Sequence, residues 1–173
     1  EVSLIKEIGD GVIPCAIPYM MNTLDDPRKN AMGDSPLENA GIEVLVDKVI
    51  GLDAGDHSID LVSDVSVRYE KLVLATGTQS VTPAIPGIEL VGVHAITKSL
   101  SAMTALREDL RAVRNLVIIG GGFIGAEFAD ELAHSQDLNI HLVEILPDLL
   151  MNAFDEEIGC EIGLGLEEAG VAL

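Results

Sequence analysis

The part of the sequence that most constrains the fold is a glycine cluster, GGGFIGAE at residues 120–127, directly after the apolar run 116–119. The pattern G-x-G-x-x-G recurs by chance, so its meaning depends on what flanks it. The apolar run is typical of a buried strand, apolar residues at helical spacing follow over 122–134, and a second strand is predicted at 140–144. This order predicts a β-α-β unit with the glycines in its first turn.

Three of the glycines have separate expected roles in such a unit. Gly120 permits the tight turn after the strand, Gly122 lets the backbone approach a pyrophosphate, and Gly125 lets the helix press against the strand. The phosphate is expected at the helix N-terminus, where free N–H groups and the helix dipole favour an anion. The predicted cofactor-binding residues of this loop are Gly120, Gly121, Gly122, Phe123, Ile124 and Gly125.

An acidic residue, Glu144, ends the second predicted strand, 19 positions beyond Gly125. A carboxylate at this point can accept a hydrogen bond from a ribose 2′-hydroxyl and repels a 2′-phosphate, which favours NAD(H) over NADP(H). The alternative is a glycine loop that serves helix–strand packing alone. The combination of strand, loop, helix, strand and acid favours the cofactor site.

The C-terminal part continues the same alternation. Ile158, Ile162 and Leu166 predict a helix over 155–168, and Val171 begins another strand. Apolar residues make up 48% of the chain and aromatic residues only 3%, a mixture of small aliphatic side chains that suits buried parallel strands. Residues 115–173 are therefore predicted to form a β-α-β-α-β half-domain of the parallel, doubly wound type.

The N-terminal part has a different pattern. We expect strands at 2–5, 41–46, 59–67 and 72–75, of which 41–46 and 59–67 alternate and are predicted to belong to a small antiparallel β-meander. Gly9, Gly11, Pro14 and Pro18 forbid a regular helix through most of residues 9–18, around Cys15. A helix of three to four turns is expected after Thr97.

Charge and cysteine content exclude several classes of function. The net charge of −19, with scattered basic residues, excludes nucleic acids and anionic membranes as partners. The two cysteines and four histidines lack metal-ligand spacing, so no metal site is expected. No apolar run is long enough to span a membrane, and we expect a cytoplasmic protein. Because the chain begins at Glu1 and stops at GVAL, we interpret it as an internal fragment.

Two segments resemble one enzyme family. GGGFIGAEFA with the later HLVEILP is similar to the NAD-binding half of the pyridine nucleotide-disulfide oxidoreductases, which are flavoenzymes. LVLATGTQSVTPAIPG, residues 72–87, resembles the segment in which the last strand of the family's FAD domain ends in A-T-G. The motifs occur in the family's order, 43 residues apart from Gly77 to Gly120. The alternative for the second segment is an ordinary boundary between a strand and a turn.

The resemblance implies an α/β fold, the FAD/NAD(P)-binding Rossmann-like two-domain flavoprotein fold, here incomplete. It implies FAD and NAD(H) as cofactors, a small-molecule electron acceptor and a homodimer for the intact protein. The expected division is a partial FAD domain at 1–95, a connecting helix at 96–114 and a partial NAD(H) domain at 115–173. Ala75, Thr76 and Gly77 would let the main chain approach a flat ligand.

The chain departs from the family pattern at its N-terminal end. The glycine loop for FAD, which would precede EVSLIKE, is absent from the sequence. The acid that the family places at the end of the first strand is replaced by Lys6, with Glu7 after it. FAD binding is therefore expected of the intact protein rather than of this segment alone.

Cys15 lies in the segment IPCAIPYMM, between two prolines. The pattern C-x-x-P-Y resembles the single-cysteine subgroup that contains coenzyme A-disulfide reductases, NADH oxidases and NADH peroxidases. The resemblance implies that Cys15 is redox-active. It also implies that Cys15 acts alone, because position 20, where the glutathione-reductase type has a second cysteine, is Met20. A single thiol is oxidised to a sulfenate, a persulfide or a mixed disulfide. The alternative is a buried structural cysteine.

Glu127 matches the family's glutamate near the nicotinamide and flavin, and with Cys15 it completes the predicted catalytic residues. Taken without the family, Glu127 is an acid in the first turn of a helix, where the dipole favours it. Cys160 has no motif around it and is expected to be a small packed core residue.

The predicted function is NAD(P)H oxidation by a flavoprotein that passes hydride from NADH through FAD to Cys15 and on to a disulfide, persulfide, peroxide or dioxygen. One alternative is an electron-transfer reductase of the ferredoxin or rubredoxin type, in which Cys15 is structural. A second is a non-catalytic NAD(H)-sensing Rossmann module. The A-T-G and C-x-x-P-Y segments favour the enzyme, because a sensor needs neither.

Overall fold

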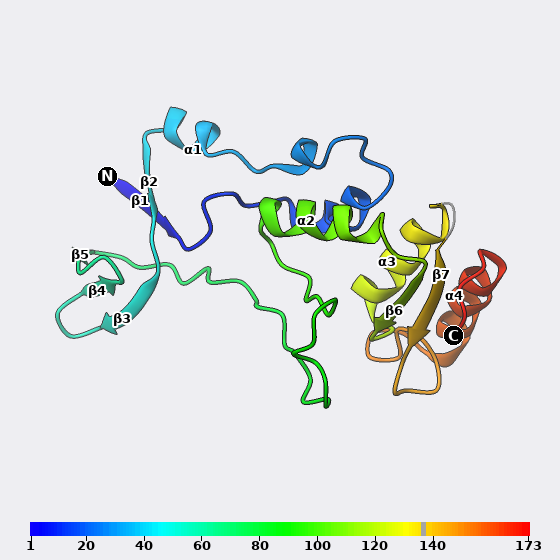
Figure 1. Cartoon of the computed structure of the whole chain (residues 1–173). Helices are drawn as coiled ribbons and strands as arrows, with labels where there is room; N and C mark the ends of the chain where they lie inside the picture. The colour runs from blue at the N-terminus through cyan, green and yellow to red at the C-terminus, as the bar shows by residue number, and fades with distance from the viewer. Residues whose placement is uncertain (136–137) are drawn as a thin grey trace. The chain divides into compact units, whose positions relative to one another are not determined.

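The computed structural model describes residues 1–135 and 138–173 (Figure 1). It divides into two compact units: unit 1 comprises 1–12 and 31–99, and unit 2 comprises 13–30 and 100–173. In chain order the elements are β1 (Val2–Lys6), the 3₁₀ turns η1 (Pro14–Ala16), η2 (Pro18–Met20) and η3 (Pro27–Asn30), α1 (Ser35–Asn39), β2 (Ile42–Val46), β3 (Val49–Asp53), β4 (Ser58–Leu61), β5 (Ser66–Arg68), α2 (Leu100–Leu110), β6 (Asn115–Ile119), α3 (Phe123–Ala133), β7 (Asn139–Val143) and α4 (Glu156–Glu168).

Unit 1 begins with a two-stranded parallel sheet, β1 beside β2, in which Val2 pairs with Ile42 and Lys6 with Val46. The prediction that the strand at 41–46 is antiparallel was wrong. Alternation of side chains indicates a strand but not the direction of its neighbour. The long connection of residues 7–41 provides the dozen or more residues that a parallel crossover needs.

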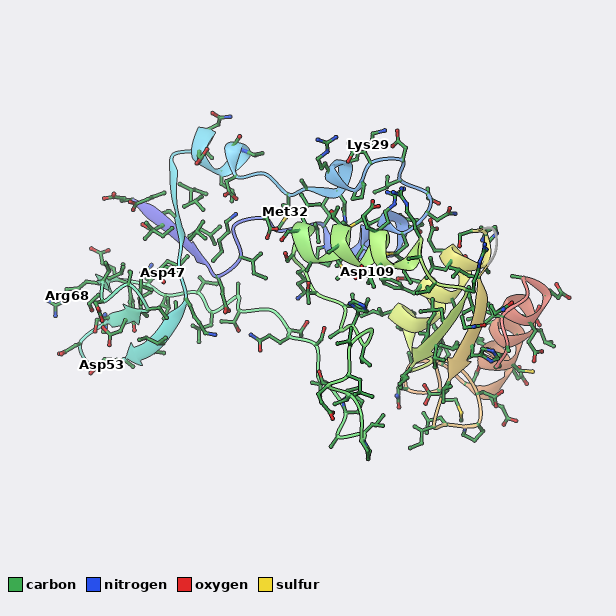
Figure 2. All side chains as sticks on the ribbon, viewed as in Figure 1. Lys29, Met32, Asp47, Asp53, Arg68 and Asp109 are labelled. Carbon is green, nitrogen blue, oxygen red and sulfur yellow. The ribbon has the colours of Figure 1, made fainter. Side chains whose placement is uncertain are left out.

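The second sheet of unit 1 is the antiparallel meander β3-β4-β5, which confirms that part of the expected fold. The single strand predicted at 59–67 is in fact two strands, separated by a turn in which Asp64 has a φ of 62°. Ile59 and Leu61 are buried on the inner face of β4. Figure 2 shows Asp53 and Arg68, both exposed, at the periphery of this meander.

The strand predicted at 72–75 is absent, and these residues have no regular secondary structure. Val73 is 84% exposed and Leu74 68% exposed. A strand is stabilised by hydrogen bonds to a neighbouring strand, and none of the sheets formed by the described residues includes this segment. The loop that follows is held by Lys98, whose Nζ donates to the carbonyl oxygen of Thr78 at 3.0 Å and to its Oγ1 at 3.2 Å.

Unit 2 contains the predicted β-α-β unit. β6 and β7 pair in parallel, from Asn115 opposite Asn139 to Ile119 opposite Val143, and α3 connects them. The helix α4 follows, with the side chain of Asp155 capping its N-terminus. The third strand expected from Val171 is present as a single parallel bridge between His141 and Ala172.

Aliphatic side chains and methionines dominate the core of unit 2. The turn η2 packs against both α2 and α3. The largest fully buried side chains include Met20, Met103 and Leu142. The other buried apolar residues of this unit are Ile17, Met21, Leu106, Ala126, Phe128, Ala129, Leu132, Ile140, Leu149, Leu150, Leu166 and Val171.

Cys160 is exposed, so the prediction that it packs in the core was wrong. The buried face of α4 is formed by Gly159, Gly163 and Leu166, which are spaced four and three residues apart. Cys160 lies next to this stripe rather than on it.

Within the described ranges, no helix is both long and apolar enough to cross a membrane.

Candidate nucleotide-binding site

The glycine loop begins with a turn that a larger residue would strain. Gly120 has a φ of 107°, in the region that residues with a Cβ rarely adopt. Its N–H donates to the carbonyl oxygen of Val143 at 2.8 Å, which joins the end of β6 to the end of β7. The chain then reverses into α3.

Space around the next glycines differs sharply. A Cβ on Gly125 would lie 1.8 Å from the carbonyl oxygen of Gly120, and one on Gly121 would lie 2.5 Å from Cδ2 of Leu149. At Gly122 nothing lies within 4 Å of such a Cβ. Gly125 is therefore required by its contact with the backbone, and a larger residue at Gly121 would have to displace the Leu149 side chain. Gly122, in contrast, faces open space that a ligand can approach.

The first turn of α3 presents main-chain donors to that space. Gly122 is the N-cap residue, no side chain caps this end of the helix, and its first turn contains no acidic residue. A helix N-terminus carries a partial positive charge of about half an elementary unit, which favours an anion such as a pyrophosphate. Phe123, the first residue of the helix, is exposed, and its ring contacts that of Phe154 edge to face, with 5.7 Å between the ring centroids.

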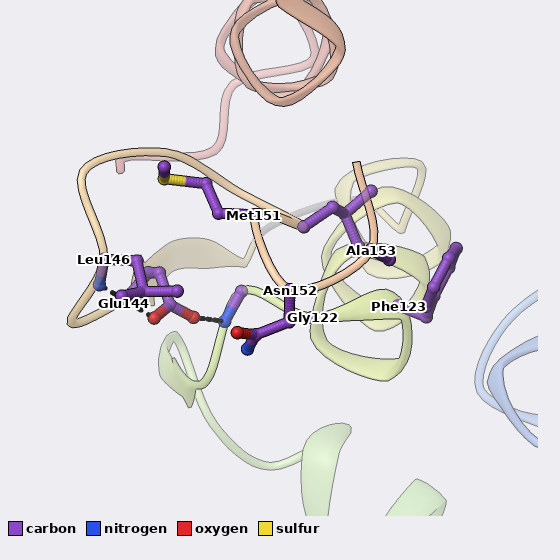
Figure 3. A pocket seen from close by; sticks show the side chains of 9 residues that line it. Gly122, Phe123, Glu144, Leu146, Met151, Asn152 and Ala153 are labelled. Carbon is purple, nitrogen blue, oxygen red and sulfur yellow. Dashed lines mark hydrogen bonds between the residues drawn. The ribbon is translucent and has the colours of Figure 1, made fainter. Parts of the chain in front are cut away.

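Glu144 lies directly beside the loop (Figure 3). Its carboxylate accepts hydrogen bonds from the N–H groups of Gly121 at 2.5 Å, Ile145 at 2.8 Å and Leu146 at 2.9 Å. These backbone hydrogen bonds, that from Leu146 first, hold the pKa of Glu144 below its ordinary value of 4.5. The side chain is therefore negatively charged at neutral pH.

A cavity of about 50 Å³ lies beside the glycine loop and this carboxylate. Gly121, Gly122, Phe123 and Glu144 line one side of it, and the segment 150–153 lines the other (Figure 3). Sequence reasoning missed this segment, because DLLMNA carries no recognisable motif. None of the described residues that line the cavity is a lysine or an arginine, the side chains that would attract a 2′-phosphate.

Leu150 fixes the far wall of the cavity. Its N–H donates to the carbonyl oxygen of Gly121 at 2.9 Å, and it is buried with a φ of 57°. The left-handed conformation is unfavourable for a leucine, so the surrounding contacts must hold it. The wall and the glycine loop are therefore joined by a main-chain hydrogen bond as well as by side chains.

Cys15 lies in the short 3₁₀ turn η1 of unit 2, and its side chain is an exposed free thiol. It is not the buried structural cysteine of the alternative interpretation. The residues after it, Ile17, Pro18 and Met20, are buried. The thiol thus lies on the outer side of a turn whose inner side is packed.

The other predicted site residues are distributed over both units. Glu127 is exposed on α3, in the same unit as the glycine loop and Cys15. It lies beyond the first turn of the helix, so the interpretation of Glu127 as a first-turn acid was wrong. Ala75, Thr76 and Gly77 lie in unit 1 as exposed chain without regular secondary structure. Lys6 forms an ion pair with Asp34, with Nζ 2.5 Å from Oδ1. In the part of the chain that the structure describes, no group of three potential ligands is arranged to hold a metal ion.

The parallel β-α-β unit, the glycine loop and Glu144 together are typical of proteins with the Rossmann-type dinucleotide-binding fold. Residues 3–173 match the family described as pyridine nucleotide-disulphide oxidoreductase, and the chain belongs to this family. The predicted family and the predicted fold class are thereby confirmed.

Curated relatives include proteins with different acceptors. The chain is 34% identical over 152 residues to an NAD(P)H coenzyme A polysulfide/persulfide reductase of Pyrococcus horikoshii, covering 84% of this chain and 34% of the relative. It is 31% identical over 149 residues to the ferredoxin–NAD(+) reductase component of a biphenyl dioxygenase system of Paraburkholderia xenovorans, covering 85% and 36%. The chain thus spans about a third of the length of these relatives.

Solved structures share the fold. An NAD-dependent persulfide reductase from A. fulgidus matches with a TM-score of 0.89 at 23% identity, covering 99% of this chain and 34% of that one. A ferredoxin reductase from Rhodopseudomonas palustris matches with a TM-score of 0.87 at 24% identity, covering 99% and 43%. At these identities the similarity establishes the fold and not the acceptor.

Proposed function

We propose that the intact protein is an FAD-dependent NADH oxidoreductase that delivers electrons to a small disulfide, persulfide, peroxide or dioxygen through Cys15. The observation that carries the proposal is an exposed thiol on a packed turn, in the same unit as a glycine loop shaped for a dinucleotide. Family membership supports the flavin and the nicotinamide.

NADH would be held by main-chain groups and one carboxylate. The N–H groups at the start of α3 would receive the pyrophosphate, in the open space beside Gly122. The negative charge of Glu144 would accept the ribose hydroxyl and repel a 2′-phosphate. The absence of a cationic residue from the described lining of the cavity supports NADH over NADPH.

FAD, when bound, would accept a hydride from NADH and pass on two electrons. The exposed main chain at Ala75, Thr76 and Gly77 fits the approach of a flat ligand, because none of the three carries a side chain larger than that of threonine. Gly77, with a φ of 66°, turns the chain away directly afterwards. Glu127 would lie near the nicotinamide and the flavin and adjust their electrostatic surroundings.

Cys15 would carry the chemistry of the acceptor. For a disulfide RSSR, the Cys15 thiolate attacks one sulfur, the S–S bond breaks and one thiolate RS⁻ leaves with a proton from solvent. The resulting mixed disulfide takes up two electrons, which releases the second RS⁻ and restores the Cys15 thiolate. In total, NADH, one proton and RSSR give NAD⁺ and two RSH.

The experiment is a comparison of two cysteine variants of the intact protein. Cys15→Ser should keep the reduction of the flavin by NADH but lose turnover with a disulfide or persulfide by about a hundredfold or more, because serine cannot form the mixed disulfide. Cys160→Ser is the matched control, since Cys160 is also exposed and free, and should behave as wild type. Full turnover of Cys15→Ser with every acceptor would exclude the thiol mechanism.

A second candidate function is supported by the relative from Paraburkholderia xenovorans, whose name states a ferredoxin–NAD(+) reductase component. In this case Cys15 takes no part in the electron transfer, and an iron-sulfur or rubredoxin-type protein accepts the electrons. Turnover that survives Cys15→Ser and needs such a protein would favour this candidate. A colourless intact protein that binds NADH would favour instead the non-catalytic NAD(H)-sensing module.

The proposal also includes a cytoplasmic homodimer, on the basis of the resemblance to the family. Measuring the molar mass of the intact protein in solution tests the dimer. Fractionating the cells that produce the protein tests its location.

A further inference from the structure

The segment that carries Cys15 is a continuous series of hydrogen-bonded turns. From Ile13 to Leu24, each turn shares residues with the next. The main-chain bonds run from Ala16 N–H to Ile13 O, Ile17 to Pro14, Met20 to Ile17, Met21 to Pro18 and Leu24 to Tyr19. Such a series transmits a constraint at one end to the other, because each turn fixes the start of the next. We call residues 13–24 the cysteine segment.

The N-terminal end of the cysteine segment is fixed by a buried amide. Asn30 is 1% exposed, and its Nδ2 donates to the carbonyl oxygen of Ile13 at 3.1 Å. The N–H of Ile13 donates in turn to the carbonyl oxygen of Asn30 at 3.1 Å. The two hydrogen bonds therefore close the chain between Ile13 and Asn30 into a loop that contains the cysteine segment.

The C-terminal end is fixed by two buried charged side chains from two different helices. Glu131 of α3 is 8% exposed, and its Oε1 accepts from the N–H of Thr23. Arg107 of α2 is 8% exposed, and its Nη1 donates to the carbonyl oxygen of Leu24 at 2.8 Å. A residue of α3 thus accepts from the N–H of Thr23, and a residue of α2 donates to the carbonyl oxygen of Leu24.

Neither charge is explained by the packing of the helices alone. Burial of a charged group is costly, and apolar residues of similar volume would pack the helices at least as well. The side chains of Glu131 and Arg107 bond to main-chain atoms of the cysteine segment, 108 and 83 residues away in the sequence. The two hydrogen bonds hold this segment in a defined position on α2 and α3.

We propose that Glu131 and Arg107 are positioning residues that hold the cysteine segment on α3 and α2 and thereby fix where the Cys15 thiol lies. The geometric part of the proposal stands on these contacts. Its consequence for electron transfer rests on the function proposed above. Glu131 lies in α3, the helix whose N-terminus follows the glycine loop. The cysteine segment is therefore anchored to the same helix that begins at the dinucleotide site.

The experiment measures amide hydrogen exchange of the intact protein in Glu131→Ala and Arg107→Met. The amides of Ile17, Met20 and Leu24 should exchange about tenfold faster or more, because a buried hydrogen bond to a charged group is lost. Glu131→Gln should restore protection, since its amide oxygen can still accept from Thr23. The matched controls are Asp130→Ala, at an exposed position of α3, and Arg111→Met, at an exposed position directly after the end of α2. Both should exchange as wild type.

Rapid kinetics of the same variants test the consequence for electron transfer. Reduction of the flavin by NADH should be unchanged in Glu131→Ala, whereas reoxidation by a disulfide should slow by about tenfold, because a misplaced thiol meets the acceptor less often. The proposal is overturned if the cysteine segment keeps its protection in both variants, or if exchange rises equally across β6, β7 and α4. If the exchange result holds while Cys15→Ser keeps full turnover, the geometric part stands and the proposed function fails.

Discussion

The two family motifs of this chain have opposite structural characters. The glycine loop of unit 2 is fixed by contacts within 30 residues, with Gly120 bonded to Val143 and Gly121 bonded to both Glu144 and Leu150. The A-T-G segment of unit 1 is exposed and irregular, and the described hydrogen bonds that hold the residues next to it come mainly from Lys98. A nucleotide loop can thus be built locally, whereas the A-T-G segment depends on neighbouring strands.

Burial shows the same contrast. All buried apolar residues of the described chain except Val12, Ile59 and Leu61 belong to unit 2. A local change in unit 2 is therefore transmitted to a packed core, while a change near the A-T-G segment meets few contacts. Substitutions at matched positions in the two regions test this difference.

The largest effect is expected for Gly125→Ala. Its Cβ would fall 1.8 Å from the carbonyl oxygen of Gly120, so α3 must move away from the loop. Overpacking of this kind costs about 3 kcal/mol, which corresponds to a loss of about a hundredfold in NADH affinity when the loop is displaced. The loss of NADH affinity is measured by titrating the intact protein with NADH and following the nicotinamide fluorescence.

The matched change in unit 1 is Gly77→Ala. The φ of 66° at Gly77 is unfavourable for alanine, and the cost should be about 1–2 kcal/mol of local stability. NADH affinity should stay within twofold of wild type, since the A-T-G segment is expected to contact the flavin. An NADH affinity lost equally in Gly77→Ala and Gly125→Ala would contradict the assignment of the two motifs to different cofactors.

A smaller loss is expected for Glu144→Gln. The amide keeps an oxygen that can accept a hydrogen bond but loses the charge, so a charge-assisted bond becomes a neutral one. We expect about a tenfold loss of NADH affinity, with NADPH affinity unchanged or improved. The ratio of the two dissociation constants is the measurement, and a ratio equal to that of wild type would count against a role for this carboxylate.

Gly165→Ala should act in the opposite direction. Gly165 lies inside α4, and nothing lies within 4 Å of a Cβ placed there. Alanine should stabilise the helix by about 0.5–1 kcal/mol, because glycine loses more conformational freedom on folding. Chemical denaturation of the intact protein measures the gain, and NADH affinity serves as the control.

The smallest effect is expected for pH. The pKa of Glu144 is lowered in the folded state, so its contribution to stability is present above its ordinary value of 4.5 and is lost as the pH falls through the lowered value. NADH affinity should therefore be constant between about pH 6 and 8 as far as Glu144 is concerned. A fall in affinity within this range that disappears in Glu144→Gln would show that the carboxylate titrates there.

The nucleotide half was predictable because its signals are local. The apolar run before Gly120, the helical spacing after Gly122 and the acid at Glu144 all lie within one β-α-β unit, and β6, α3 and β7 follow them closely. By contrast, the expected strand at 72–75 and the expected direction of β2 were wrong, because both depend on which strands lie alongside.

Parts of the site were beyond prediction for a related reason. The wall formed by Leu150 depends on a left-handed leucine that no sequence pattern indicates. Glu131 and Arg107 would be expected on exposed helix faces from their charge, and their burial depends on main-chain partners 108 and 83 residues away. Cys160 was misassigned because three neighbouring glycines obscure which face of α4 is buried.

The central claim is that the glycine loop and Glu144 form a site for NADH. Its most direct test is equilibrium titration of the intact wild-type protein with NADH and with NADPH under the same conditions. The account predicts that NADH binds at least about tenfold more tightly, because Glu144 accepts the ribose hydroxyl and repels the phosphate. Equal or tighter binding of NADPH, or no binding of either dinucleotide, would contradict it.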